Sequence, residues 1–113
     1  MITSETVRQL ALALPETMEQ PHFEKNAFRI NGKIFATHSA EKQQVVVKLN
    51  EVDQSVFSAM GKGSCYPVAG GWGKQGWTVI ELSSAEEVFL QDALKTAWLT
   101  VAPPKLVTKY FPG

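Results

Sequence analysis

The dipeptide Asn31-Gly32 is the feature that most constrains the fold of this chain. Asn-Gly is the preferred pair for a two-residue type I′ turn, because both central residues of that turn need a positive φ. Strand-forming segments flank the pair, so residues 23–30 and 33–40 are predicted to form an antiparallel β-hairpin. A two-residue loop also sets the register, which predicts Phe28 opposite Phe35 with both side chains facing the core.

Three helices are predicted from apolar residues at helical spacing. The first begins at Thr3 or Ser4 and ends at Pro15, and the second is capped by Asn50 and ends at Gly61. The third follows a doubled capping box, Ser83 and Ser84 with Glu86 and Glu87, and ends at Pro103-Pro104. The residues that these helices are expected to bury are, in order, Val7, Leu10, Ala11 and Leu14, then Val52, Val56, Phe57 and Met60, then Leu90, Leu94, Ala97, Trp98 and Val101.

Two further strands are predicted over residues 43–49 and 77–82. Residues 61–76 hold six of the eight glycines and are predicted to be loop with at most one short strand. The order α-β-β-β-α-β(β)-α, with short turns between strands, predicts a two-layer α+β fold in which helices cover one face of an antiparallel sheet. The chain of 113 residues is expected to form a single domain over residues 1–113.

The charges of the chain are unevenly distributed along it. Eleven cations balance eleven anions, and a neutral chain is a poor polyanion binder if its charges are evenly spread. However, residues 1–24 contain one cation and four anions, whereas residues 25–50 contain five cations and one anion. The neutral total is therefore a cancellation between regions, and a basic face remains possible.

Strand alternation assigns part of this positive charge to the face without helices. The residues expected on that face are Lys25, Ala27, Arg29, Ile34, Ala36, His38, Val46, Lys48, Trp77, Val79 and Glu81. One interpretation is a phosphate-binding surface. The alternative is a solvated face whose lysines keep the sheet soluble and discourage edge pairing.

The segment 70–77, Gly-Gly-Trp-Gly-Lys-Gln-Gly-Trp, is the most unusual in the chain. It contains the letters G-x-G-x-x-G, but a strand follows it where a dinucleotide site needs a helix, and the Gly-Lys-Ser/Thr of a P-loop is absent. Trp72 and Trp77 flank Lys74, a pattern suited to stacking on bases together with phosphate contact. The alternative is a wide turn with one or both tryptophans packed on the sheet.

Catalytic and metal-binding patterns are sparse. Cys65, His22 and His38 are the only thiol and imidazoles, and their spacing matches neither a zinc site nor a required Cys-His pair. Glu16, Glu19 and Glu24 could bind a hard cation, or they could form a solvated acidic edge. We expect no catalytic residue, no metal and no cofactor.

Several segments in a fixed order resemble one protein family. They are residues 10–15 (Leu-Ala-Leu-Ala-Leu-Pro), Glu19, His22-Phe23, residues 28–36, and Gly71-Trp72-Gly73-Lys74 leading into Trp77. Together they look like the MmcQ/YjbR family, over the chain from Val7 to about Val101. The resemblance implies a CyaY-like fold and a small bacterial protein of a group commonly described as DNA-binding, through similarity to a "double wing" arrangement.

The family's motifs fall on particular residues of this chain. Its hairpin motif matches Phe28, Arg29, Gly32, Lys33 and Phe35, and its later motif matches Lys74 and Trp77. Many members carry a His and an Asn-Lys pair just before that tryptophan, where this chain has Gly-Trp-Gly-Lys.

Two functions remain open from the sequence. The first is DNA binding, weak and salt-sensitive, with phosphate contacts and stacking from Lys25, Arg29, Lys33, Lys48, Lys62, Lys74, Trp72 and Trp77. The second is a protein-interaction or chaperone-like module that uses an apolar patch of Ile34, Val46, Val79 and Trp77. With one cysteine, no signal peptide pattern in residues 1–15 and no long apolar run, the chain is expected to be a cytoplasmic monomer.

Overall fold

The computed structural model describes residues 1–22 and 24–113, and Phe23, the first residue of the predicted hairpin, lies outside them. The helices are α1 (Ser4–Leu12), α2 (Glu51–Met60), α3 (Gly71–Lys74), α4 (Glu87–Val101) and α5 (Pro104–Tyr110). The strands are β1 (Thr17–His22), β2 (Lys25–Ile30), β3 (Lys33–Ser39), β4 (Gln44–Lys48), β5 (Cys65–Pro67) and β6 (Trp77–Glu81).

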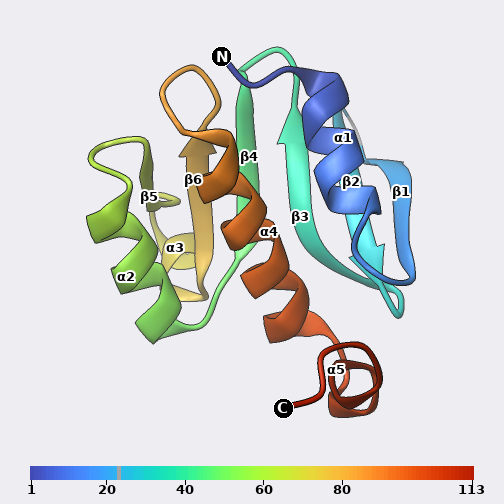
Figure 1. Ribbon diagram of the computed structural model, residues 1–113. Coiled ribbons are helices and arrows are strands. Elements are labelled where there is room, and N and C mark those ends of the chain that lie inside the picture. Colours follow the sequence, from blue (N-terminus) through green and yellow to red (C-terminus); the bar gives the residue numbers. More distant parts are fainter. Residues whose placement is uncertain (23) are drawn as a thin grey trace.

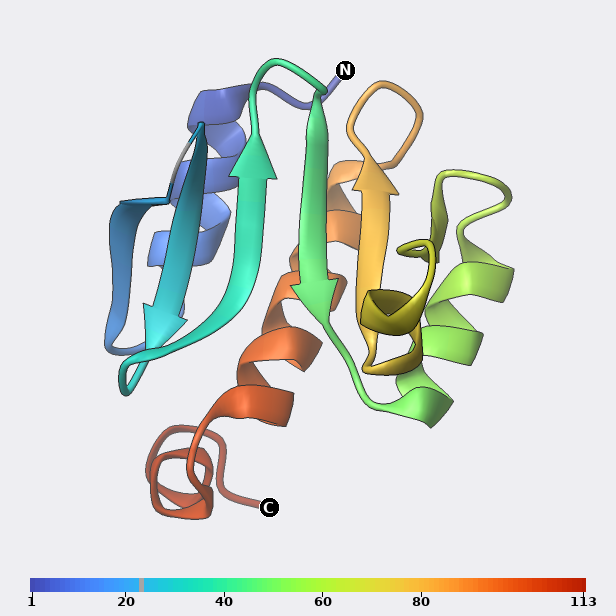
Figure 2. The same cartoon turned by 180° about the vertical axis from the view of Figure 1, so that it is seen from behind.

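The strands form one six-stranded sheet in the order β1-β2-β3-β4-β6-β5, with every neighbouring pair antiparallel. In Figure 1, α1, α2 and α4 lie in front of this sheet. Figure 2 shows the opposite face, where β2, β3 and β4 are uncovered and α3 stands in front of β6. The predicted α+β fold is therefore confirmed, with the short α3 as the exception on the far side.

The hydrophobic core lies between the sheet and its covering helices. Its largest fully buried side chains are Val7, Phe28, Ile30, Phe35, Val45, Val47, Leu49, Ile80, Leu82, Leu90, Leu94 and Trp98. The predicted stripes of the first and last helices are confirmed, since their residues are buried or pack against this core. Burial of this much apolar surface is the main favourable contribution to the stability of such a fold.

The apolar residues that α2 was predicted to bury are mostly exposed. Only Phe57 packs inward, with its ring 5.4 Å from that of Phe89. Val52, Val56 and Met60 are 71%, 48% and 61% exposed, so the prediction that α2 buries them is wrong. The helix lies over β5 at the edge of the sheet, where few partners reach its outer side.

Three elements were not predicted from the sequence, namely β1, the short helix α3 and α5. β1 contains Pro21 and forms one edge of the sheet, which is where a strand tolerates a proline. Pro103-Pro104 ends α4 as predicted but also begins α5, because proline suits the first turn of a helix. α5 brings Tyr110 and Phe111 onto Trp98, with ring centroids 6.4 and 5.1 Å away.

The helix caps are partly as predicted. Thr3 accepts a hydrogen bond from the Thr6 backbone N–H at 3.2 Å, and Asn50 accepts one from that of Asp53 at 2.7 Å. The doubled capping box is wrong, because α4 begins at Glu87 and its N-cap residue, Glu86, makes no side-chain capping hydrogen bond.

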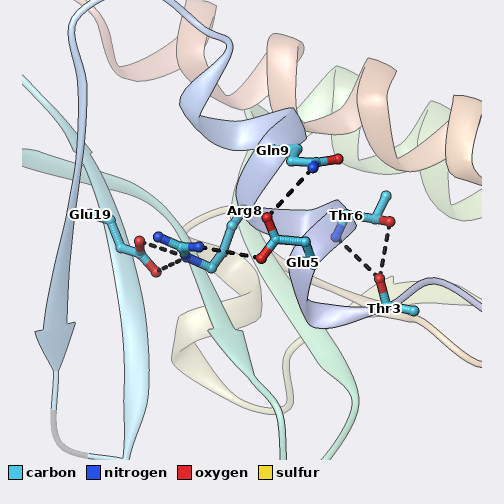
Figure 3. A network of polar contacts seen from close by, with 6 residues as sticks. All are labelled: Thr3, Glu5, Thr6, Arg8, Gln9 and Glu19. Carbon is cyan, nitrogen blue, oxygen red and sulfur yellow. Dashed lines mark hydrogen bonds and ion pairs between the residues drawn. The ribbon is translucent and has the colours of Figure 1, made fainter.

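Polar contacts also fasten α1 to the first strand. Arg8 Nε donates to both carboxylate oxygens of Glu19, at 2.9 and 3.1 Å, and its Nη1 contacts Glu5 (Figure 3). Glu19 is thereby engaged in a bond between a helix and a strand.

The register of the hairpin also differs from the prediction. Asn31 and Gly32 have φ of 53° and 79°, so the predicted turn is confirmed. The pairing nevertheless shifts between Arg29, which pairs with Ile34, and Phe28, which pairs with Ala36. Phe28 does not oppose Phe35, because one extra residue on β3 creates a β-bulge.

The bulge changes which β3 residues face the helices. Beyond it, Ala36 pairs with Val47 and His38 with Val45, and both valines belong to the core. The prediction that Ala36 and His38 lie on the face without helices is therefore wrong, and Thr37 takes that place. A shift of one residue moves every later side chain to the other face of the sheet.

Candidate functional site on the open sheet face

The face of the sheet opposite α1 and α4, here called the open face, is built by cross-strand pairs. Thr37 pairs with Val46 and Val46 with Val79, while Lys48 pairs with Trp77. Because paired residues point to the same side, these side chains form rows across the sheet. The outward placement predicted for the strands β4 and β6 is confirmed.

A groove of about 380 Å³ runs over the middle of the open face. Its lining residues are His22, Lys25, Ile34, Thr37, Val46, Val68, Trp72 and Trp77. The strand order places Ile34, Thr37 and Val46 as its floor, between a polar side at β1–β2 and an aromatic side at β6 and α3. The groove is thus apolar at its centre, basic on one side and aromatic on the other.

Glycines hold the aromatic side close to the sheet. A Cβ at Gly73 would lie 1.9 Å from the carbonyl oxygen of Val68, and one at Gly76 would lie 1.9 Å from that of Leu49. Gly76 also has a φ of 104°, which side chains rarely adopt. These two glycines permit a close backbone approach that a side chain would block.

A side chain from α2 adds a second attachment. Gln54 Nε2 donates to the carbonyl oxygen of Gly73 at 2.9 Å and to Thr78 Oγ1 at 3.1 Å. The predicted loop therefore contains a short helix, α3, fixed from both sides. Trp72 projects from it into the groove and is 64% exposed.

Trp77 and Lys48 form a packed pair beside the groove. Lys48 Nζ lies 5.5 Å from the centroid of the Trp77 ring, and it donates a hydrogen bond to the carbonyl oxygen of Gln75. Trp77 is half-buried by this arrangement. Lys48 therefore stabilises the aromatic side of the groove through a cation–π contact.

The structure brings six of the eight predicted contact residues to the open face. Besides Trp72, Trp77 and Lys48, Lys25 lines the groove, and Arg29 pairs with Ile34 and donates from Nη1 to the Gly32 carbonyl oxygen at 3.1 Å. The sixth, Lys74, is the exposed last residue of α3.

Lys33 and Lys62 lie elsewhere. Lys33 pairs with the buried Ile30 at the tip of the hairpin, so it belongs to the helix side. Lys62 lines a separate groove with Glu86 and Asp92, between α2 and α4. The structure therefore does not bring these two lysines to the open face.

A model of the YjbR family matches residues 12–100. The chain belongs to the YjbR family. The crystal structure of Deinococcus radiodurans protein DR2400, with the family-model domain DUF419, has a similar fold, with a TM-score of 0.74 at 19% identity. The match covers 97% of this chain and 81% of that one. No curated protein matches the chain.

The open face of this YjbR protein also carries a polar cluster that the sequence did not indicate. Tyr66 OH donates to Glu81 Oε2, and Gln44 Nε2 donates to the same oxygen at 3.0 Å. The hydrogen bond to Glu81 raises the pKa of Tyr66. Both donors partly neutralise the effect of the Glu81 carboxylate on the open face.

The groove contains three residues that sequence reasoning missed: His22, Thr37 and Val68. Thr37 was not among the residues expected on the open face, because no sequence signal marked the bulge. His22 lies at the end of a strand that was not predicted, and Val68 lies in the glycine-rich segment.

The thiol and imidazole groups of the YjbR chain lie apart. His38 pairs with Val45, Val45 with Ile80 and Ile80 with Cys65, so two strands separate His38 from Cys65. At about 4.8 Å between neighbouring strands, the separation is roughly 14 Å, too far for a Cys-His hydrogen bond. Burial raises the pKa of Cys65 to about 11.

Two of the three acidic residues considered for a cation have other partners. Glu19 binds Arg8, and Glu16 Oε2 accepts a hydrogen bond from Tyr110 OH at 2.6 Å. Within residues 1–22 and 24–113, no group of three or more His, Cys, Asp or Glu side chains could hold a metal ion. Within the same residues, no helix has the length and apolar character needed to cross a bilayer.

Proposed function

We propose that this YjbR-family protein binds DNA through the open sheet face. The observation that carries the proposal is Trp72, an exposed indole held over a groove by a fixed element, with Lys25, Arg29 and Lys74 on the same face. Cations contact phosphates, and aromatic side chains stack on bases in proteins that bind nucleic acid. The family resemblance in the sequence supports the same proposal.

The zero net charge is compatible with binding through one face. Five acidic residues lie on α2, on α4 or at the N-cap of α4, on the other side of the sheet, namely Glu51, Asp53, Glu86, Glu87 and Asp92. Phosphates on the open face would meet Lys25 and Arg29 first. Distant like charges still weaken the attraction at low salt, where the screening length is long. We therefore expect weak binding.

A titration of fluorescently labelled DNA at about 50 and 200 mM salt tests the proposal. The wild type should bind at the lower salt and lose affinity at the higher one, as counterions compete for the phosphates. Charge reversal in Arg29→Glu/Lys74→Glu should weaken binding by about tenfold or more, since charge-assisted contacts become repulsive.

Lys33→Glu/Lys62→Glu is the matched control, because it makes the same double charge reversal on the helix side. It should bind nearly as well as the wild type. No detectable binding at about 50 mM salt would contradict the proposal, as would equal losses in Lys33→Glu/Lys62→Glu and in the open-face variant.

The apolar floor of the groove favours a second candidate, binding of an extended protein segment. Ile34 and Val46 are half-buried and line the groove beside Trp77, whereas Val79 is only 7% exposed and contributes little. An apolar segment of a partner could cover this floor. Such binding should resist salt and be lost in Ile34→Glu, while Arg29→Glu/Lys74→Glu should leave it unchanged.

A further inference from the structure

We infer that the ligand of the open face is single-stranded DNA and that the groove takes one unpaired base, stacked on Trp72. The inference rests on the proposed DNA binding and specifies its substrate. It places the sugar-phosphate backbone toward the basic side of the groove, where Lys25 lies.

The first argument is the presentation of Trp72. A large indole with 64% of its surface exposed gains little from folding, whereas the other two tryptophans are packed. The element that carries it is fixed by the close approach of Gly73 to Val68 and by the bond from Gln54. A side chain held in place before binding loses less conformational entropy when a ligand stacks on it.

The second argument is the size and chemistry of the groove. At about 380 Å³, it lies at the small end of the range of roughly 300–1,000 Å³ for sites of small molecules. Its walls offer an indole on one side and Lys25 on the other, above a floor of Ile34, Val46 and the hydroxyl-bearing Thr37. A flat ring with polar edges and an attached anion, such as a nucleotide unit, matches this distribution.

The third argument concerns strandedness. Inside a duplex, both flat faces of a base are covered by stacked neighbours, so an indole on a sheet can reach only an unpaired base. A duplex would instead have to be held through phosphates. Lys48 is already engaged with Trp77 and Gln75, which leaves Lys25, Arg29 and Lys74 as the open-face cations of the predicted set. Three phosphate contacts without stacking support little affinity in a neutral protein.

The test compares three labelled ligands of equal length, about 12 units each, at about 50 mM salt. They are an oligothymidylate strand, the same backbone with abasic sites throughout, and a mixed-sequence duplex. The strand with bases should bind about 5- to 150-fold more tightly than the abasic strand, the range for loss of one stacked base. It should also bind more tightly than the duplex.

Trp72→Ala should remove this preference and lower the affinity for the thymidylate strand by the same 5- to 150-fold. Trp72→Phe should keep part of it, because a smaller ring still stacks. Val88→Ala is the matched control, since Val88 is an apolar side chain, 66% exposed, on α4 at the helix side. It should change nothing. Circular dichroism establishes whether each variant is folded. If Trp72→Ala does not fold, the comparison of the three ligands on the wild type tests the inference by itself.

The outcomes separate this inference from the proposed function. Equal binding of all three ligands, with the loss in Arg29→Glu/Lys74→Glu retained, would overturn the stacked base and leave DNA binding standing. Tighter binding of the duplex than of the thymidylate strand would also overturn the stacked base and leave DNA binding standing. Absence of binding to every ligand would overturn both.

Discussion

At the residue scale, the three tryptophans show how far the position of a side chain depends on its surroundings. Trp98 is fully buried and donates from Nε1 to the Pro15 carbonyl oxygen at 2.9 Å. Trp77 is half-buried under Lys48, and Trp72 is exposed over the groove. Helical periodicity placed Trp98 in the core, but the two tryptophans of the glycine-rich segment differ through contacts with distant strands.

His38 provides a test of the corrected register. It is 3% exposed on the core side, and neither ring nitrogen has a hydrogen-bond partner among the described residues. Burial lowers the pKa of His38 below its ordinary value of 6.5, with the charge of Glu19 acting in the opposite direction. The unfolded chain therefore takes up a proton more readily than the folded one as the pH falls through 6.5.

The free energy of unfolding of the wild type should consequently decrease as the pH falls from about 7.5 to 5.5, through the unfolded value of 6.5 and toward the lower folded pKa. His38→Phe, which removes the titrating group, should show a shallower decrease across this window. Denaturant titrations at several pH values measure both. Identical pH dependence in the two proteins would contradict a buried, neutral His38.

Cys65 is predicted to be unreactive in the folded protein. It is 3% exposed, and burial raises its pKa to about 11, so little thiolate forms near neutral pH. At about pH 8, a thiol-specific reagent should react at least about 100-fold more slowly with the native protein than with the denatured one. Absorbance of the released chromophore measures the two rates, and similar rates would contradict the buried position in β5.

At the element scale, the short helix α3 shows why a glycine-rich segment need not be a loose loop. Gly73 and Gly76 approach other backbone segments so closely that a methyl group does not fit, whereas Gly71 in the same helix has open space around its Cβ position. The distinction depends on what packs against each glycine, so it could not be predicted from the run of glycines itself.

Gly73→Ala should therefore destabilise the protein by about 1–3 kcal/mol or more, because the new methyl group displaces the Val68 backbone. Gly71→Ala is the matched control, and it should be neutral or stabilising by about 0.4–1 kcal/mol, because alanine restricts the unfolded chain. Urea denaturation measures both. Equal effects of the two substitutions would show that close packing at Gly73 is unimportant.

The hairpin and α2 show two further limits of local patterns. The turn residues determined where the β2–β3 connection lies, but the bulge at Phe35 arises because both Phe35 and Ala36 are buried against the covering helices. In α2, the spacing of Val52, Val56 and Met60 is typical of a buried face, yet they are exposed because α2 lies at the sheet edge. Periodicity predicts a helix but not how many neighbours it has.

At the scale of the whole molecule, the sheet divides the predicted cations between its two sides. Six basic residues were predicted as phosphate contacts, but Lys33 and Lys62 lie on the helix side and Lys48 is engaged with Trp77. Lys25, Arg29 and Lys74 remain available on the open face. Three cations are thus available to a ligand on the open face, which is half of the six that the sequence suggested.

This difference predicts a measurable salt dependence. With three phosphate contacts, the logarithm of the binding constant for single-stranded DNA should fall with the logarithm of salt concentration with a slope of about −2, since each contact contributes about 0.7. Six contacts would give a slope near −4. Titrations at four or more salt concentrations measure the slope, and the steeper value would contradict the arrangement of cations described above.

The sequence by itself determined the features that depend on residues close together in the chain. These are the Asn31-Gly32 turn, the Thr3 and Asn50 caps, the apolar stripes of α1 and α4 and the outward placement on β4 and β6. They result from backbone dihedral preferences, local hydrogen bonds and periodic burial. Because these causes act between residues a few positions apart, they can be predicted from the sequence.

Only the tertiary structure decided which side chains share the groove. Lys25, Thr37, Trp72 and Trp77 come from separate elements, and their meeting depends on the bulge in β3, on the added strand β1 and on the anchoring of α3 by Gln54. Each of these is a contact between segments far apart in sequence, whose free energy depends on the packing of the whole sheet and its helices. For that reason the motifs were visible in the sequence, but their assembly into one site was not.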